Sequence, residues 1–315
     1  MTRVAAKVPE AAHVLIDFKP QHDFFVGIDS DGCAFDAMEL KHKECFIPTI
    51  VKVWGLQAVS KYTRETCEFV NLYSKTRGLN RWIALTRVFD LLRERPEVIA
   101  RNAKVPRGDR LKEVIASGYP LSHKGMVQYA ADHAERFGPD PELEQAVLWS
   151  KTVDEAIADM VHGVPPFPYV RESLQKMQGQ VDLMVVSATP LEALEREWGE
   201  HGIAQYMTVI AGQEMGTKKQ HLQFAAKGKY PDDRILLIGD APGDRDAAKS
   251  VDVLYYPINP GAEDASWKRF HNEALGKFLD GTYAGTYEEA LIAEFEKLLP
   301  ETPPWQKLER IEWED

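Results

Sequence analysis

The chain has 315 residues, of which 44% are apolar and 28% are charged, so it can bury a sizeable core in about two domains. Its net charge of -11 excludes a broad basic surface for nucleic acid, although a small basic pocket for an anionic substrate stays compatible with it. Three cysteines without CxxC spacing exclude a disulfide framework and a zinc site.

The N-terminal part of the chain predicts two short strands. Residues 12–18 indicate an edge strand, and residues 24–28 form a short apolar run that ends at an acidic turn. Apolar runs of this length are typical of buried strands in a parallel sheet. We therefore expect residues 24–28 to form such a strand.

A long helical block follows. Within residues 37–164, Leu79, Trp82, Thr86 and Phe89 recur at spacings of three and four, which is the period of a helix. Glycine and proline breaks separate several such segments, and strand-like alternation is missing. We expect residues 37–164 to form an all-helical domain that is inserted after the first strand.

From residue 165 the pattern alternates between strand and helix, which predicts a parallel sheet with helices on both faces. Residues 1–36 and 165–315 should therefore form a discontinuous α/β core. The tail beyond Gly261 is rich in aromatic residues, and either packing on the core or a subunit contact would explain it. The expected strands are 181–186, 206–211, 234–238 and 253–256, and the expected helices are 169–177, 191–200, 219–226, 245–249 and 287–298.

Polar residues follow the predicted strands where ligands of an open parallel sheet bind, beyond the carboxyl ends. A carboxylate there can attack phosphorus, and Mg²⁺ can relieve the repulsion among several carboxylates. A hydroxyl and a lysine can hold the other phosphoryl oxygens. The residues in question are Asp29, Asp31, Ser187, Lys218, Lys219, Asp240 and Asp244.

Four segments, in order along the chain, carry a family resemblance. Residues 29–36 (DSDGCAFD) resemble the motif D-x-D-G-x-x-x-D, and residues 239–248 (GDAPGDRDAA) resemble G-D-x-x-x-D-x-x-A-A. Ser187 and Lys218 stand between them in the family's order. The chain thus resembles phosphatases of the haloacid dehalogenase (HAD) superfamily, which implies a Rossmann-like three-layer core. The helical insertion resembles the C1-type cap of that family.

The resemblance implies a role for each matching residue. Asp29 would be the nucleophile and a ligand of Mg²⁺, and Asp31 would be the general acid and base, with its backbone carbonyl on the metal. Asp31 also favours phosphatases and phosphomutases over dehalogenases. The phosphate would be bound by Ser187, Ala188 and Lys218, and the metal site would be completed by Asp240 and Asp244.

Several alternatives stay open from the residues alone. Ser187 and Asp244 also suit helix N-termini, and Lys219 is an alternative to its neighbour Lys218. In the helical block, Arg77 and Arg81 surround a loop, and they either are solvated or reach the substrate.

These observations predict a Mg²⁺-dependent phosphatase that acts on a small phosphorylated metabolite through an aspartyl phosphate. A sugar-phosphate mutase on the same core is the alternative, and a non-catalytic binding protein is a third. Residues 1–10 lack the apolar core of a signal peptide, and no apolar stretch reaches the roughly 18 residues of a membrane helix. We therefore expect a cytoplasmic protein without membrane or nucleic-acid partners, and no pattern supports an oligomer.

Overall fold

The computed structural model describes residues 8–306, which fall into two compact units. The core unit comprises residues 8–37 and 163–298, and the helical unit comprises residues 38–162 and 299–306. The sequence placed residues 299–306 with the core instead. Within residues 8–306, no helix combines the length and apolar character that are needed to cross a membrane.

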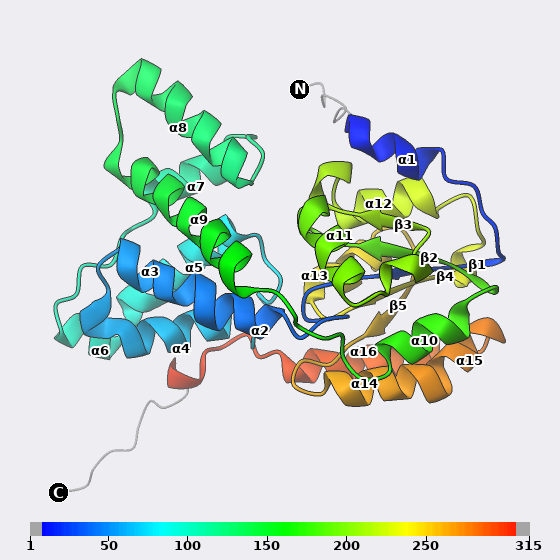
Figure 1. The fold of residues 1–315 in the computed structure, drawn as a ribbon. Helices are drawn as coiled ribbons and strands as arrows, with labels where there is room; N and C mark the ends of the chain where they lie inside the picture. Colours follow the sequence, from blue (N-terminus) through cyan, green and yellow to red (C-terminus); the bar gives the residue numbers. More distant parts are fainter. Residues whose placement is uncertain (1–7, 307–315) are drawn as a thin grey trace, which may run out of the picture. The chain divides into compact units, whose positions relative to one another are not determined.

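A five-stranded sheet forms the centre of the core unit, in the order β3-β2-β1-β4-β5 (Figure 1). All neighbouring strands are parallel, which confirms the predicted α/β class. The strands are β1 (Phe24–Ile28), β2 (Val181–Val186), β3 (Val209–Ala211), β4 (Ile235–Gly239) and β5 (Leu254–Pro257).

Strand β1 is the middle strand of the sheet, with β2 on one side and β4 on the other, and its residues 25–28 are buried. Its last residue, Ile28, pairs with Val185 of β2 and Ile238 of β4. A side chain at Gly27 would place its Cβ 2.9 Å from Val186, so this position needs glycine for close strand packing. The carboxyl ends of these three strands therefore meet at one edge of the sheet.

Helices cover both faces of the sheet. Helices α12 (Lys218–Ala225) and α13 (Pro242–Lys249) pack on the face that carries Phe25, Met184 and Leu237. Figure 1 shows α10 (Val170–Met177), α14 (Glu263–Arg269) and α15 (Leu275–Leu279) on the side of the sheet away from α12. Helix α11 (Leu191–Glu200) connects β2 to β3, and α16 (Thr286–Leu298) packs against β5.

Three expectations for this unit are wrong. Residues 12–18 do not form an edge strand: a 3₁₀ turn (Glu10–Ala12) leads into the short helix α1 (His13–Ile16), because Ala12 and Leu15, three residues apart, are both buried. Strand β3 is shorter than expected, since a 3₁₀ turn takes residues 204–206 and only three residues pair with β2. The tail holds α14, a π-helical turn at residues 270–274 and α15, where only a later helix was expected.

The aromatic residues of the tail between Trp267 and Phe295 pack on the core unit. Trp267 and Phe270 are fully buried, and the Trp267 indole N–H donates to the carbonyl of Cys33 at 2.7 Å. The Tyr283 hydroxyl donates to the carbonyl of Tyr255 at 2.7 Å. Of the two explanations for this segment, packing on the core is the one that the structure supports.

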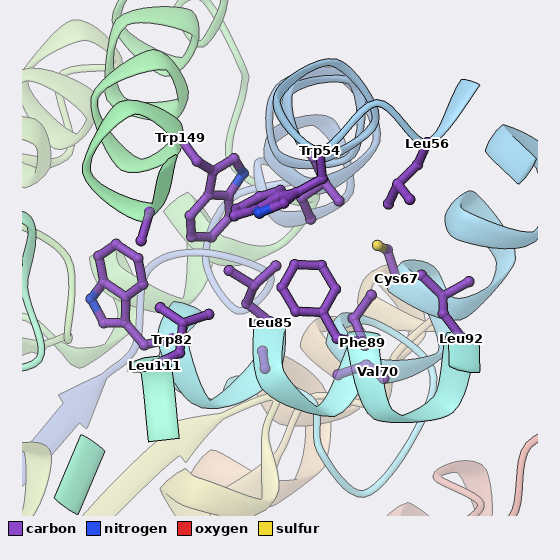
Figure 2. Close-up of a cluster of buried hydrophobic side chains, with 14 of the residues drawn as sticks. Trp54, Leu56, Cys67, Val70, Trp82, Leu85, Phe89, Leu92, Leu111 and Trp149 are labelled. Carbon is purple, nitrogen blue, oxygen red and sulfur yellow. The ribbon is translucent and has the colours of Figure 1, made fainter. Parts of the chain in front are cut away.

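The helical unit contains no strand among its described residues. Figure 2 shows Trp54, Trp82 and Trp149 converging on Leu85 and Phe89 in its centre. A short helix α2 (Met38–Leu40) and a π-helical turn (Lys41–Phe46) lead into the larger elements of the unit. These are α3 (Ile47–Val53), α4 (Ser60–Asn71), α5 (Arg81–Glu94), α6 (Pro96–Ala100), α7 (Asp109–Ala116), α8 (His123–Phe137) and α9 (Pro141–Met160).

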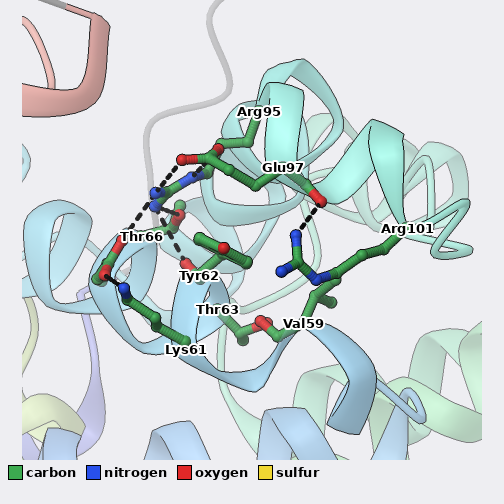
Figure 3. Close-up of polar contacts among 9 residues, drawn as sticks. Val59, Lys61, Tyr62, Thr63, Thr66, Arg95, Glu97 and Arg101 are labelled. Carbon is green, nitrogen blue, oxygen red and sulfur yellow. Dashed lines mark hydrogen bonds and ion pairs between the residues drawn. The ribbon is translucent and has the colours of Figure 1, made fainter. Parts of the chain in front are cut away.

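Residues 299–306 belong to the helical unit because Trp305 packs on Arg95. The Arg95 guanidinium group lies 4.3 Å from the Trp305 ring centroid and 4.8 Å from that of Tyr62. Arg95 is buried and forms an ion pair with Glu65 at 2.7 Å. Figure 3 shows Arg95 beside Tyr62 and Thr66. Each cation–π contact of this kind, at a desolvated guanidinium, stabilises a folded protein by about 1–2 kcal/mol.

Candidate active site

The loop after β1 is fixed by backbone hydrogen bonds. The N–H of Asp29 donates to the carbonyl of Ile238 on β4 at 3.0 Å. The Ser30 carbonyl then accepts the N–H groups of Ala34 and Phe35, at 2.8 and 3.1 Å, which closes a tight turn. Gly32 has a φ of 76° in this turn, a conformation that favours glycine. Asp29 and Asp31 are thus held at the carboxyl end of the middle strand.

Lys218 lies among the carboxylates. The side chain of Thr217 caps α12, so Lys218 is the first residue of that helix. Its Nζ lies 2.7 Å from Oδ2 of Asp29 and also forms an ion pair with Asp244. Lys219 is exposed. Of the two adjacent lysines, the structure therefore brings Lys218 to the carboxylates.

Three carboxylates form a cluster that suits a hard cation. Asp29, Asp240 and Asp244 each offer one oxygen, and these oxygens lie within 4.8 Å of one another. All three residues are buried. Mg²⁺ is bound in proteins by one or two carboxylates with phosphate oxygens and water, so this donor set fits Mg²⁺ better than a soft metal. The side chain of Asp31 is not part of the cluster.

Asp244 is positioned by its neighbours on α13. This helix begins at Pro242, so Asp244 is its third residue and not its N-cap. Its Oδ2 accepts the N–H of Ala241 at 3.1 Å, while Oδ1 faces Lys218. A Cβ at Gly239 would lie 2.5 Å from the Cβ of Asp244, so glycine at the end of β4 lets this side chain approach the cluster.

The charges at this edge change the pKa values of the groups. Burial raises the pKa of Asp29 to about 8, the carboxylates of Asp244 and Asp240 add to the increase, and Lys218 opposes it. Burial lowers the pKa of Lys218, but Asp244 and Asp29 outweigh it and raise that pKa above its usual value. The cluster is thus short of positive charge, and a divalent cation would relieve this.

Ser187 and Thr189 follow β2 at the same edge. Ser187 is buried, and its N–H donates to the carbonyl of Ala211 on β3 at 3.1 Å. Its Oγ accepts the N–H of Thr189 at 3.2 Å. Helix α11 has Pro190 as its N-cap, so Ser187 does not cap that helix. Ala188 is exposed in this loop.

The sequence does not predict the residues of segment 187–198 that hold the turn after β1. Oγ of Ser30 accepts the indole N–H of Trp198 at 3.0 Å and donates to Oε2 of Glu197 at 2.9 Å. The hydroxyl of Thr189 donates to Oδ2 of Asp31 at 3.0 Å. Thr189 could have been suspected because it follows Ser187 by two residues, whereas nothing in the sequence marks Trp198 and Glu197.

Arg77 and Arg81 are both engaged within the helical unit. Arg77 is buried and donates to the carbonyl of Leu72 at 2.9 Å. Arg81 forms an ion pair with Asp154 at 2.7 Å and lies over the ring of Phe46. The sequence-based alternative of freely solvated side chains therefore does not hold for these two arginines.

Comparison with known proteins finds likeness in structure only. No family model and no curated protein matches the chain. A haloacid dehalogenase-like family protein from Streptococcus pneumoniae is 13% identical, with 78% of this chain and 90% of that chain covered and a TM-score of 0.41. A predicted phosphoglycolate phosphatase from Haemophilus somnus is 15% identical, with 76% and 88% covered and a TM-score of 0.46.

A third solved structure is that of the HAD-hydrolase candidate YfnB from Bacillus subtilis, determined bound to magnesium. It is 12% identical, with 76% of this chain and 88% of that chain covered and a TM-score of 0.41.

Proposed function

We propose that this chain is a HAD-type phosphatase that hydrolyses phosphate monoesters of small metabolites. The observation that carries the proposal is the meeting of Asp29, Asp240, Asp244 and Lys218 at the carboxyl edge of a parallel sheet. A buried cluster of three carboxylates and one lysine is costly to keep unless a ligand uses it. Three of the four motifs supply these residues, the remaining one supplies Ser187, and all four occur in the order that the family shows.

In the proposed reaction, Asp29 attacks the phosphorus atom and forms an aspartyl phosphate. The ester P–O bond breaks, and Asp31 gives its proton to the leaving oxygen. Asp31 then takes a proton from the water that cleaves the aspartyl phosphate, which releases phosphate and restores Asp29. Ser187, the backbone at Ala188 and Lys218 hold the phosphoryl oxygens during both steps.

The metal belongs to the proposal as well. Mg²⁺ would be held by Asp29, Asp240 and Asp244, with the Asp31 carbonyl as a further ligand, and would neutralise charge on the carboxylates and the phosphoryl group. We assign substrate selection to the helical unit as a cap, with Arg81, whose side chain is partly exposed, as its candidate substrate contact. A lower affinity for the substrate in Arg81→Ala, with kcat unchanged, would support that assignment.

The test is release of phosphate from a panel of phosphorylated sugars, polyols and short acids, with and without Mg²⁺. Asp29→Asn should lower the rate by about 10⁴-fold or more, since it removes the nucleophile and keeps the shape of the side chain. Asp246→Asn is the matched control, because Asp246 is an exposed residue on α13 that pairs with Arg245. Equal rates for wild type and Asp29→Asn would refute the proposed function.

A further inference from the structure

The segment from Ser187 to Trp198 contacts two consecutive residues of the turn after β1. At its beginning, the hydroxyl of Thr189 donates to Oδ2 of Asp31 at 3.0 Å. At its end, Trp198 donates to Oγ of Ser30 at 3.0 Å. The turn that carries the proposed acid is therefore held from outside its own strand.

Asp31 needs such a contact because it lies in the turn, three residues beyond the end of β1. The sheet fixes Asp29 through its backbone N–H, which bonds to β4. For Asp31, the hydroxyl of Thr189 holds one carboxyl oxygen, which sets the direction in which the carboxyl group faces. A carboxyl group gives its proton efficiently only when it points at the leaving oxygen.

Thr189 also touches the phosphate-holding side of the site. Its backbone N–H donates to Oγ of Ser187 at 3.2 Å, while its side chain reaches Asp31. One residue thus fixes the position of the proposed acid relative to the hydroxyl that would hold the phosphoryl group. Because both bonds come from the same residue, the distance between acid and phosphoryl group depends on it.

We propose that Thr189 is the positioning residue for the proton transfer from Asp31 to the leaving group. This inference rests on the proposed function, and it extends it to a residue outside the four motifs. Trp198 and Glu197 hold the same turn through the hydroxyl of Ser30.

A pair of substrates separates positioning of the acid from a general structural role. The leaving group of 4-nitrophenyl phosphate departs without a proton, whereas that of an alkyl phosphate needs one. We would measure kcat/KM, which reports the steps up to formation of the aspartyl phosphate. The alkyl substrate is the sugar or polyol phosphate that wild type hydrolyses with the highest kcat/KM.

We expect Thr189→Val, which keeps the volume and removes the hydroxyl, to lower kcat/KM about 10- to 100-fold for the alkyl phosphate. For 4-nitrophenyl phosphate the decrease should stay below about 3-fold. Thr189→Ser keeps the hydroxyl and should stay within about 3-fold of wild type on both substrates. If Thr189→Val does not fold, Thr189→Ala, which only removes atoms, takes its place.

The outcomes distinguish the two proposals. If wild type releases phosphate from neither kind of substrate, the proposed function fails. If wild type hydrolyses both and Thr189→Val affects both equally or neither, the function stands and the role of Thr189 is refuted. Equal losses in Thr189→Ser and Thr189→Val would also refute it, because the hydroxyl would then not matter.

Discussion

Two buried carboxylate sites lie at opposite edges of the same sheet, and they differ in what surrounds them. At the carboxyl edge, Asp29 shares its site with Asp240 and Asp244. At the amino edge, Asp182 near the start of β2 is surrounded by donors. Burial acts on both groups, yet it raises the pKa of Asp29, whereas the pKa of Asp182 is lowered.

The donors explain the difference. Burial alone would raise the pKa of Asp182, but hydrogen bonds from Tyr230 and His22 outweigh it. The Tyr230 hydroxyl donates at 2.6 Å, and the backbone N–H groups of Gln21 and His22 donate at 2.9 and 3.0 Å. A buried carboxylate whose oxygens are filled by the protein's own donors stabilises the fold, whereas one that faces other carboxylates is available for a ligand.

The largest expected effect is the loss of stability of the folded chain when Asp182 is replaced. Asp182→Ala leaves several buried donors without an acceptor, so we expect a loss of about 3 kcal/mol in the free energy of unfolding. Urea titration would measure it, with Asp23→Asn as the control because the Asp23 side chain is exposed. The folded fraction should keep the kcat of wild type. A stable but inactive Asp182→Ala would break the comparison.

The second effect is the pH dependence of stabilisation by Mg²⁺. The pKa of Asp29 is raised to about 8 in the folded chain, above its unfolded value, so folding takes up a proton there at neutral pH. Protons then compete with the cation, and stabilisation by Mg²⁺ should increase as the pH rises through about 8. At saturating Mg²⁺ we expect about 2–3 kcal/mol at high pH, measured as a shift in melting temperature.

The control for this pH dependence is Asp29→Asn, in which the increase between about pH 6 and pH 9 should be much smaller. Stabilisation by Mg²⁺ that decreases over the same range would contradict the proposed role of the cluster. The pKa of Asp182 is lowered, so its contribution is present above its unfolded pKa and is lost only as the pH falls through its folded pKa. The stabilisation by Mg²⁺ at the carboxyl edge should therefore change near pH 8, whereas the contribution of Asp182 to stability should change only at acidic pH.

The smallest effect concerns a single donor. Tyr230→Phe removes one hydrogen bond to Asp182 and leaves the backbone donors in place, so we expect a loss of about 1 kcal/mol. Urea titration of Tyr230→Phe, Asp182→Ala and the double variant would measure the coupling free energy between Tyr230 and Asp182. Additive losses would show that the hydroxyl of Tyr230 contributes to stability independently of Asp182, which would contradict the proposed hydrogen bond.

The sequence predicted the parts of the fold that depend on short-range patterns. The apolar run at residues 24–28, the strand at 181–186 and the helix at 191–200 are where the spacing places them. The prediction of a strand at residues 12–18 was wrong because this segment combines a strand-like alternation with the helical spacing of Ala12 and Leu15. In the tail, Trp267, Phe270, Ala274 and Phe278 do follow a helical period, so that signal was present.

The candidate site was predictable where residues stand at strand ends. Asp29, Lys218, Asp240 and Asp244 meet because parallel strands bring their carboxyl ends together. Their catalytic roles stay predictions. What the sequence could not show are partners that are brought together by the tertiary fold, such as Trp198 on Ser30, since no local period records which distant side chain will supply a donor.

The docking of Trp305 on Arg95 has a consequence for the order in which the chain is completed during synthesis. Residues 38–162 leave the ribosome early, but the piece that covers Arg95 follows only after all five strands of the core have been made. Synthesis of the helical unit therefore starts before the last strands of the sheet are made and ends after them. A loop of about 200 residues must close for this contact, at an entropic cost that grows slowly with its length.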